Sequence, residues 1–205
     1  SFIKNFGNIG NLNGNFTIDS DTLIRQYDTN IKEKRNINNF IFNSNSKTNK
    51  FGFLNSHAFL IKNTNSENKN TTYKNKKNFY LSGVYQFNSS LPLIKENENF
   101  QNIFKPKLSF KAAPNHTKDD RNTESKIDLS NIYSIDRATD DTSIEGGLSV
   151  AYGFDYSISD KLKTKEIFNL KLANNFRIEN NDDLSNSNQI GEKTSNIFNE
   201  MTFSP

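Results

Sequence analysis

The longest alternating stretch of the sequence is SIEGGLSVAYGFDYSIS, residues 143–159, in which apolar side chains alternate with small or polar ones. Because successive side chains of a β-strand point to opposite faces, the even-numbered residues from Ile144 to Ile158 share one face and the odd-numbered residues share the other. A helix would scatter the aromatic side chains around its circumference, and each glycine in it would cost about 0.5–1 kcal/mol relative to alanine. The pattern therefore predicts a β-strand.

This strand would be unusually long. At about 3.3 Å per residue it would extend ~50 Å, or ~35 Å along the membrane normal at a tilt near 45°, whereas strands of soluble proteins average about 5–6 residues. Its apolar face carries no charge, because Glu145 and Asp155 both fall on the opposite face. A lipid-facing Lys or Arg near the midplane of a transmembrane barrel would cost about 2–4 kcal/mol. The stretch therefore predicts a strand that crosses a membrane.

The polar composition agrees with this prediction. The chain has 205 residues, of which 33% are hydrophobic and 12% aromatic, and its net charge is +3. A transmembrane barrel needs an apolar residue only at every second strand position, whereas a disordered chain would be poor in aromatic residues. No window approaches the 18 or more consecutive apolar residues of a membrane helix. The net charge is too small to favour a nucleic-acid partner.

Alternation recurs along the chain, which predicts about eight to ten strands in sequence. The clearest further examples are residues 79–87, 104–112 and 168–178, and weaker ones are 11–18, 37–44, 50–61 and 194–203. We therefore predict an all-β fold, an antiparallel meander that forms part of a large outer-membrane β-barrel. Because the chain begins at Ser1 without an initiator Met and stops at Pro205 in the middle of an apparent strand, we interpret it as a fragment with an open sheet, one partial barrel domain over residues 1–205.

The predicted connections alternate in length. Long polar loops are expected near residues 19–36, 62–77, 113–141 and 179–191, with shorter connections at 45–49, 88–99 and 159–163. Outer-membrane barrels have short turns on the periplasmic rim and long loops on the external rim. All the long loops would then lie on one side of the membrane.

The two faces of the predicted strands assign residues to lipid or to the barrel lumen. Five residues are predicted to face lipid: Leu148, Val150, Tyr152, Phe154 and Tyr156. Five are predicted to face the lumen: Lys105, Lys107, Lys111, Glu145 and Asp155. The three lysines either attract anionic groups of a lipid or sugar or form a hydrated lumen face. The faces also predict that Val150→Arg impairs membrane insertion and that Ser149→Arg is tolerated better.

Nothing in the sequence indicates catalysis or a cofactor. The chain has no Cys and only two distant His, which excludes thiolate metal sites and disfavours a metal centre. Glu145 and Asp155 would lie about 33 Å apart along one strand, too far for an acid and base pair. The acidic run DRATDD lacks the spacing of a calcium loop. We expect no enzyme activity, no catalytic residue, no metal and no cofactor.

Residues 88–158 resemble the C-terminal barrel region of the LPS-assembly protein family LptD, also called organic solvent tolerance protein. The resemblance rests on SSLPLIK, on the Pro-containing strand around Pro106, on NIYSIDR ending at Arg137, and on Glu145-Gly146-Gly147 opening a long strand with Tyr152-Gly153. It implies a barrel in the cell outer membrane of a Gram-negative bacterium. With a lipoprotein plug, such a barrel receives lipopolysaccharide from periplasmic bridge proteins and releases it into the outer leaflet through a lateral opening.

The expected partners are thus lipopolysaccharide, the outer-membrane lipoprotein plug, the periplasmic bridge proteins of the transport system and membrane lipid, with no nucleic acid. The chain would be a wall segment of the translocon. Two alternatives stay open: another outer-membrane barrel such as a porin or receptor, and an extracellular β-rich binding module. A single curved sheet with Leu148 and Tyr152 on its convex side favours a barrel, whereas two stacked sheets that bury them favour the module.

Overall fold

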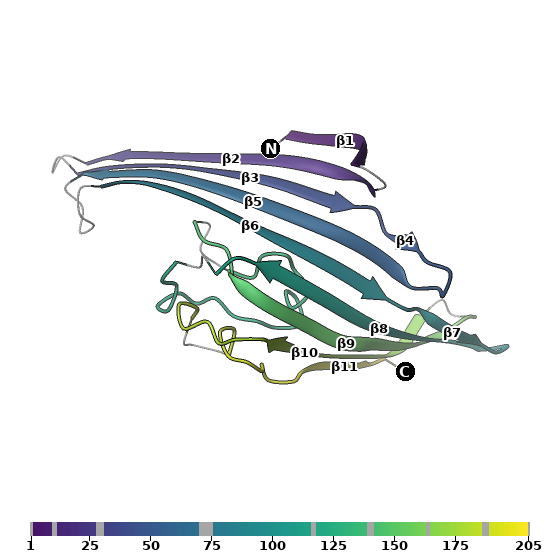
Figure 1. Ribbon diagram of the computed structural model, residues 1–205. Coiled ribbons are helices and arrows are strands. Elements are labelled where there is room, and N and C mark those ends of the chain that lie inside the picture. The colour runs from purple at the N-terminus through teal and green to yellow at the C-terminus, as the bar shows by residue number, and fades with distance from the viewer. Residues whose placement is uncertain are drawn as a thin grey trace.

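The computed structural model describes residues 2–9, 12–27, 31–69, 76–115, 118–138, 142–162, 165–185 and 189–204. All regular secondary structure in these residues is β, in one antiparallel sheet of eleven strands (Figure 1). The strands are β1 (Phe2–Ile9), β2 (Leu12–Gln26), β3 (Lys32–Ser44), β4 (Lys47–Thr48), β5 (Leu54–Lys69), β6 (Lys76–Ser90), β7 (Leu93–Glu96), β8 (Phe100–Ala113), β9 (Gly147–Asp160), β10 (Lys165–Arg177) and β11 (Phe198–Phe203).

The strands follow one another across the sheet as a meander. Their order is β1-β2-β3-β5-β6-β8-β9-β10-β11, while short β4 pairs with β5 and short β7 pairs with β8. The sheet is open, with β1 and β11 at its edges, and it bends around the long connections (Figure 1). This confirms the predicted all-β antiparallel meander with an open sheet. The strand number exceeds the prediction because β4 and β7 occupy two of the expected short connections.

The strand predicted from residues 143–159 begins later than expected. β9 starts at Gly147, whose φ of 93° lies in the left-handed region that favours glycine. Residues 143–146 therefore belong to the connection that precedes the strand, and Glu145 is not a strand residue. β9 pairs with β8 along its whole length, from Gly147 opposite Ala113 to Asp160 opposite Phe100.

The predicted long loops at 19–36 and 62–77 are wrong over most of their length. β2 and β3 stay paired from Gly14 opposite Ser44 to Gln26 opposite Lys32. β5 and β6 stay paired from Leu54 opposite Ser90 to Asn68 opposite Lys76. These segments were predicted as loops because they are polar and lack apolar alternation, but they pair as strands. Residues 28–30, 70–75, 116–117, 139–141 and 186–188, which fall in the four predicted loops, lie outside the described residues.

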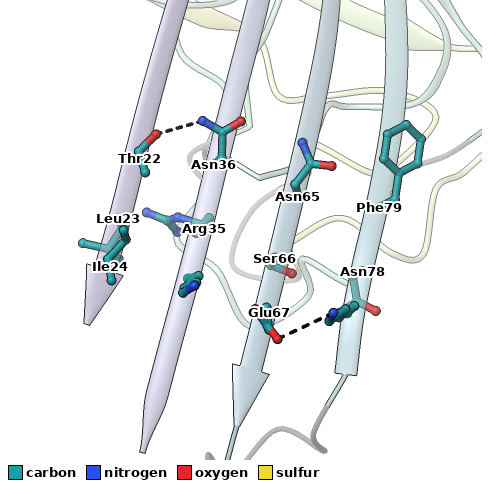
Figure 2. Close-up of a pocket in the computed structure, with 12 residues that line it drawn as sticks. Thr22, Leu23, Ile24, Arg35, Asn36, Asn65, Ser66, Glu67, Asn78 and Phe79 are labelled. Atoms are coloured by element: carbon teal, nitrogen blue, oxygen red, sulfur yellow. Dashed lines mark hydrogen bonds and ion pairs between the residues drawn. The ribbon is translucent and has the colours of Figure 1, made fainter. Parts of the chain in front are cut away.

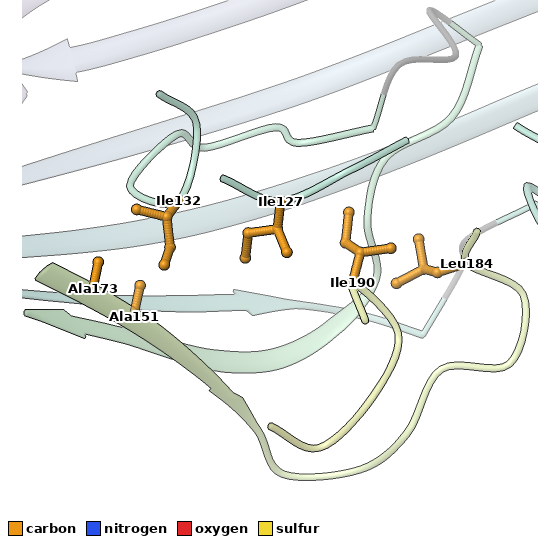
Figure 3. Packing of buried hydrophobic residues seen from close by; sticks show 6 residues of the cluster. All are labelled: Ile127, Ile132, Ala151, Ala173, Leu184 and Ile190. Carbon is orange, nitrogen blue, oxygen red and sulfur yellow. The ribbon is translucent and has the colours of Figure 1, made fainter. Parts of the chain in front are cut away.

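The hydrophobic core lies between one face of the sheet and the long connections β8–β9 and β10–β11. One cluster joins the strand residues Ala151 and Ala173 to connection residues (Figure 3), which are Ile127, Ile132, Leu184 and Ile190. A second cluster joins Leu60, Val84 and Ala113 to Ile144. Burying one such branched side chain contributes about 1.5–3 kcal/mol. The connections are therefore packed onto the sheet, and we call the covered face the inner face and the opposite face the outer face.

None of the described residues forms a helix that is long and apolar enough to span a membrane.

Candidate functional site: the two faces of the sheet

The outer face of β9 carries the five residues predicted to face lipid. Leu148 is 39% exposed and Tyr152 is 48% exposed, although both lie in the middle of the sheet rather than at its edges. Val150, Phe154 and Tyr156 are half-buried on the same face. Tyr156 lies 6.1 Å from Phe168 of β10 between ring centroids. Phe104 lies 5.2 Å from Phe154 between ring centroids. These side chains are not sandwiched between two sheets.

A band of aromatic rings continues across the outer face of the N-terminal strands. Phe42 and Phe59 lie 6.2 Å apart between centroids, and Phe59 and Tyr85 lie 5.0 Å apart. His57 Nδ1 forms a hydrogen bond with the Tyr85 hydroxyl at 2.9 Å. Aromatic pairs contribute about 0.5–1.5 kcal/mol beyond their buried area. Further large apolar side chains are exposed beside this band, including Ile61, Leu81 and Leu108. So large an exposed apolar surface requires a non-aqueous partner.

The inner face, by contrast, carries charge under the connections. Glu145, which is 0% exposed, contacts three cations: Lys111 of β8, Arg137 of the β8–β9 connection and Arg177 of β10. Arg137 Nε donates to Glu145 Oε2 at 2.7 Å, and Arg177 Nη2 donates to the Gly146 carbonyl at 2.5 Å. We call these four charged residues the Glu145 cluster.

The Glu145 cluster fastens the β8–β9 connection to the sheet. Arg137 also donates to Asn175 Oδ1 at 2.9 Å and to Ser149 Oγ at 3.1 Å, so one guanidinium joins the connection to β9 and β10. Burial alone raises the pKa of Glu145, but the adjacent charges of Arg137 and Lys111 outweigh it and hold the pKa well below its usual range. The carboxylate therefore remains ionised and neutralises part of the positive charge around it.

Gly147 is required where the connection enters β9. Its φ is 93°, and an added Cβ would lie 2.7 Å from Nη2 of the buried Arg177. The motif Glu145-Gly146-Gly147 thus turns the chain so that the carboxylate points under the connection and β9 starts at Gly147, the last residue of the motif. The motif residues on which the family resemblance rests, Arg137 and Glu145 to Gly147, meet in one place.

A second ion pair fastens the same connection to β5. Lys62 is buried, and its Nζ lies 3.0 Å from Asp136 Oδ2 and donates to the Ser143 carbonyl at 2.8 Å. The C-terminal part of the β8–β9 connection, from Asp136 to Glu145, is therefore held by two inward-pointing lysines, Lys62 on β5 and Lys111 on β8.

The other predicted lumen residues also lie on the inner face. Lys107 forms an ion pair with Asp155, and its Nζ lies 5.4 Å from the centroid of the Tyr133 ring. Lys105 is half-buried and lines a cavity of about 230 Å³ with Lys107 and Tyr133. Burial, with a contribution from the charge of Asp155, raises the pKa of Tyr133 to about 12. The hydrated lumen face offered as one interpretation does not hold for Lys111, which is buried and paired.

Sequence reasoning missed the role of Arg177, Asn175 and Lys62. Arg177 is 1% exposed and Asn175 is 0% exposed. The available signal was positional for two of the cations: Lys111 and Arg177 each lie on the polar face of a strand, in the half that leads to a long connection. Ser149 is buried against Arg137, so Ser149→Arg would place a third guanidinium beside two others. The expected tolerance at that position is withdrawn, and half-buried Ser157 of the same face is the better choice.

Among the described residues, no group of three or more His, Asp or Glu side chains could hold a metal ion.

An open antiparallel sheet with an aromatic, apolar outer face and a charged inner face packed under long connections defines the wall of an outer-membrane β-barrel. A family model described as LptD: LPS transport system D matches residues 7–205, and the chain belongs to this family. Membership gives the chain a role in lipopolysaccharide transport and assembly at the outer membrane. A comparison with curated proteins finds no match.

Proposed function

We propose that the chain is a wall segment of the outer-membrane translocon that inserts lipopolysaccharide into the outer leaflet. The observation that carries this proposal is the separation of the two faces. Leu148 and Tyr152 expose apolar surface on one side of β9, while Ser149 and Ala151 between them are buried under the connections on the other. A sheet with this division separates hydrocarbon from a polar interior.

In this proposal the inner face of the wall does not line an open pore. The β8–β9 and β10–β11 connections pack on the inner face through Ile132 and Leu184 and through the Glu145 cluster, so this part of the lumen is filled by protein. Lys105 and Lys107, nearer the other rim, offer a polar surface for a lipoprotein plug. Lipopolysaccharide would reach the barrel from periplasmic bridge proteins, as the family membership suggests.

A binding module built as a sandwich receives no support, because the described residues form one sheet and Tyr152 is exposed rather than covered. A porin or receptor barrel would share the two faces, and membership of the LptD family favours the translocon.

The test is a pair of arginine substitutions on β9 in the complete protein. Tyr152→Arg should reduce the yield of heat-modifiable, membrane-inserted barrel, because a lipid-facing Arg costs about 2–4 kcal/mol near the midplane. Ser157→Arg, on the inner face of the same strand, is the matched control and should insert as the wild type does. Equal insertion of the two variants, with equal lipopolysaccharide at the cell surface, would contradict the proposed orientation.

A further inference from the structure

A groove of about 490 Å³ crosses β2, β3, β5 and β6 close to the ends of these strands (Figure 2). Thr22, Asn36, Asn65 and Phe79 form one row across the four strands, and Lys34 and Lys77 belong to the next row toward the strand ends. We call it the rim groove. Neither the aromatic band nor the Glu145 cluster includes any of these residues.

The rim groove opens on the outer face. Asn36 lies six positions from Phe42 along β3, and Asn65 lies six positions from Phe59 along β5. An even separation along a strand keeps side chains on one face. The groove residues therefore continue the aromatic face beyond the point where it becomes polar, about 20 Å along the strand from Phe59 at ~3.3 Å per residue.

The groove also lies at the external rim of the wall. The strand ends beside it are those joined by the β2–β3 and β5–β6 connections, and antiparallel order puts the long β8–β9 and β10–β11 connections at the same end (Figure 1). Long connections mark the external side of outer-membrane barrels. The outer surface at this height adjoins the head groups of the outer leaflet.

The chemistry of the groove suits a phosphorylated sugar. Asn36 Nδ2 donates to Thr22 Oγ1 at 2.8 Å, and Asn65 Nδ2 donates to Asn63 Oδ1 at 2.6 Å, so amides and hydroxyls are oriented side by side with both donor and acceptor capacity. Phe79 is 72% exposed and presents a ring at one end. Two lining side chains on the outer face are cationic, Lys34 and Lys77, and one is anionic, Glu67, whereas Arg35 points to the inner face.

The cations are available to a ligand. Lys77 Nζ lies 3.9 Å from Glu67 Oε1, and the Lys77 side chain is 84% exposed, so this pair is loose. A phosphate would attract Lys34 and Lys77 more strongly than one shared carboxylate does, because charge-assisted bonds to phosphate are strong. We propose that the rim groove binds the phosphorylated sugar head group of a lipopolysaccharide molecule in the outer leaflet. The proposal rests on the proposed function, because it needs this wall to stand in that leaflet.

The experiment measures lipid binding to the complete protein, inserted in phosphatidylcholine nanodiscs. The probes are bisphosphorylated lipid A, lipid A without phosphates, and phosphatidylglycerol. The double variant Lys34→Gln with Lys77→Gln should bind bisphosphorylated lipid A about tenfold more weakly or worse, since it loses two charge-assisted contacts. Phe79→Ser should weaken binding of both forms of lipid A. Lys95→Gln is the matched control, because Lys95 is exposed on the outer face at the opposite rim.

Unchanged lipid A affinity in the double variant, or competition by phosphatidylglycerol as effective as that by lipid A, would overturn the proposal. Lys77 and Phe79 are exposed and Lys34 is half-buried, so the single Lys77→Gln replaces the double variant if insertion falls. Insertion and surface lipopolysaccharide are recorded for each protein. If the variants insert and transport normally but bind lipid A like the wild type, the proposed binding role of the groove is wrong and the proposed function is unaffected. If the wild-type wall fails to insert, the proposed function is wrong.

Discussion

The two halves of the sheet end differently on the side where the long connections lie. In β2, β3, β5 and β6 the polar residues continue as paired strands, whereas beyond β8, β9 and β10 the chain leaves the sheet and folds back over the inner face (Figure 1). The division lies between β6 and β8, which pair only from Tyr85 to Ser90. Beyond Tyr85, β6 extends past the end of β8 toward the rim.

The difference shows two ways to satisfy polar groups beyond the apolar part of the sheet. On the strand extensions, hydroxyls and amides bond to one another across strands, as Ser20 Oγ does to Asn38 Oδ1 at 2.7 Å. In the connections, charged groups are buried and bond to one another and to backbone carbonyls, as in the Glu145 cluster. Breaking a cross-strand amide pair exposes groups to water, whereas breaking a buried ion cluster leaves a charge without compensation. The C-terminal half should therefore be far more sensitive to single substitutions.

The largest expected effect is that of Glu145→Gln. The substitution leaves Lys111, Arg137 and Arg177 buried without a carboxylate, and removal of one partner of a buried ion pair typically costs about 3–5 kcal/mol. The β8–β9 connection should open while the β-ladder persists. Limited trypsin digestion of the inserted protein, followed by mapping of the cut sites, should show rapid cleavage between residues 118 and 138.

Glu67→Gln in the N-terminal half is the control for Glu145→Gln. It removes the exposed carboxylate beside Lys77, and surface pairs contribute about 0–1 kcal/mol. Its digestion should match that of the wild type.

Because the pKa of Glu145 is below its ordinary 4.5, the carboxylate stabilises the fold fully above that pH and progressively less as the pH falls. Wild type and Glu145→Gln should therefore converge in acid, and similar digestion of both at neutral pH would refute the cluster's role.

A smaller effect is expected from Gly147→Ala. Alanine would have to adopt a φ of 93° and place its Cβ 2.7 Å from Arg177 Nη2, and a strained backbone of this kind costs about 1–3 kcal/mol. Gly83→Ala in β6 is the matched control, since its nearest contact would be the Leu60 carbonyl at 3.6 Å. Thermal unfolding in detergent should show a lower midpoint only for Gly147→Ala. Equal midpoints would mean that the turn before β9 adapts without strain.

Much of the fold follows from period-two alternation of apolar residues. A strand with one face against a hydrophobic environment needs an apolar side chain at every second position. β9 and β10 were predicted on this basis, with Asn174 as the one interruption of the apolar face. The structure explains Asn174, whose amide donates to the carbonyls of Ser195 at 2.9 Å and Asn196 at 3.2 Å. The strand extensions of β2 to β6 were missed because continuous polar runs such as Ser20-Asp21-Thr22 lack apolar alternation and also occur in loops.

The candidate site was only half predictable. Parity along a strand assigns Leu148 outward and Lys111 inward, since it depends on local geometry alone. The partners of Lys111 depend on how the β8–β9 connection folds back. No local sequence pattern specifies that Arg137 and Arg177 both pair with Glu145. Contacts of this kind are set by long-range packing.

The smallest expected effect concerns Tyr133, where the connection packs on Lys107. Burial and the charge of Asp155 raise the pKa of its hydroxyl to about 12 from an ordinary 10, so the folded protein holds this proton more tightly than the unfolded chain. Its contribution to stability is complete below pH 10 and is lost as the pH rises toward 12. The hydroxyl has no hydrogen-bond partner among the described residues, so Tyr133→Phe should leave neutral stability nearly unchanged and flatten the alkaline decline. Tyr27→Phe, at an exposed ring in the N-terminal half, should decline like the wild type. Unfolding midpoints between pH 9 and 12 give the comparison, and parallel declines in all three proteins would show that the connection does not enclose this side chain.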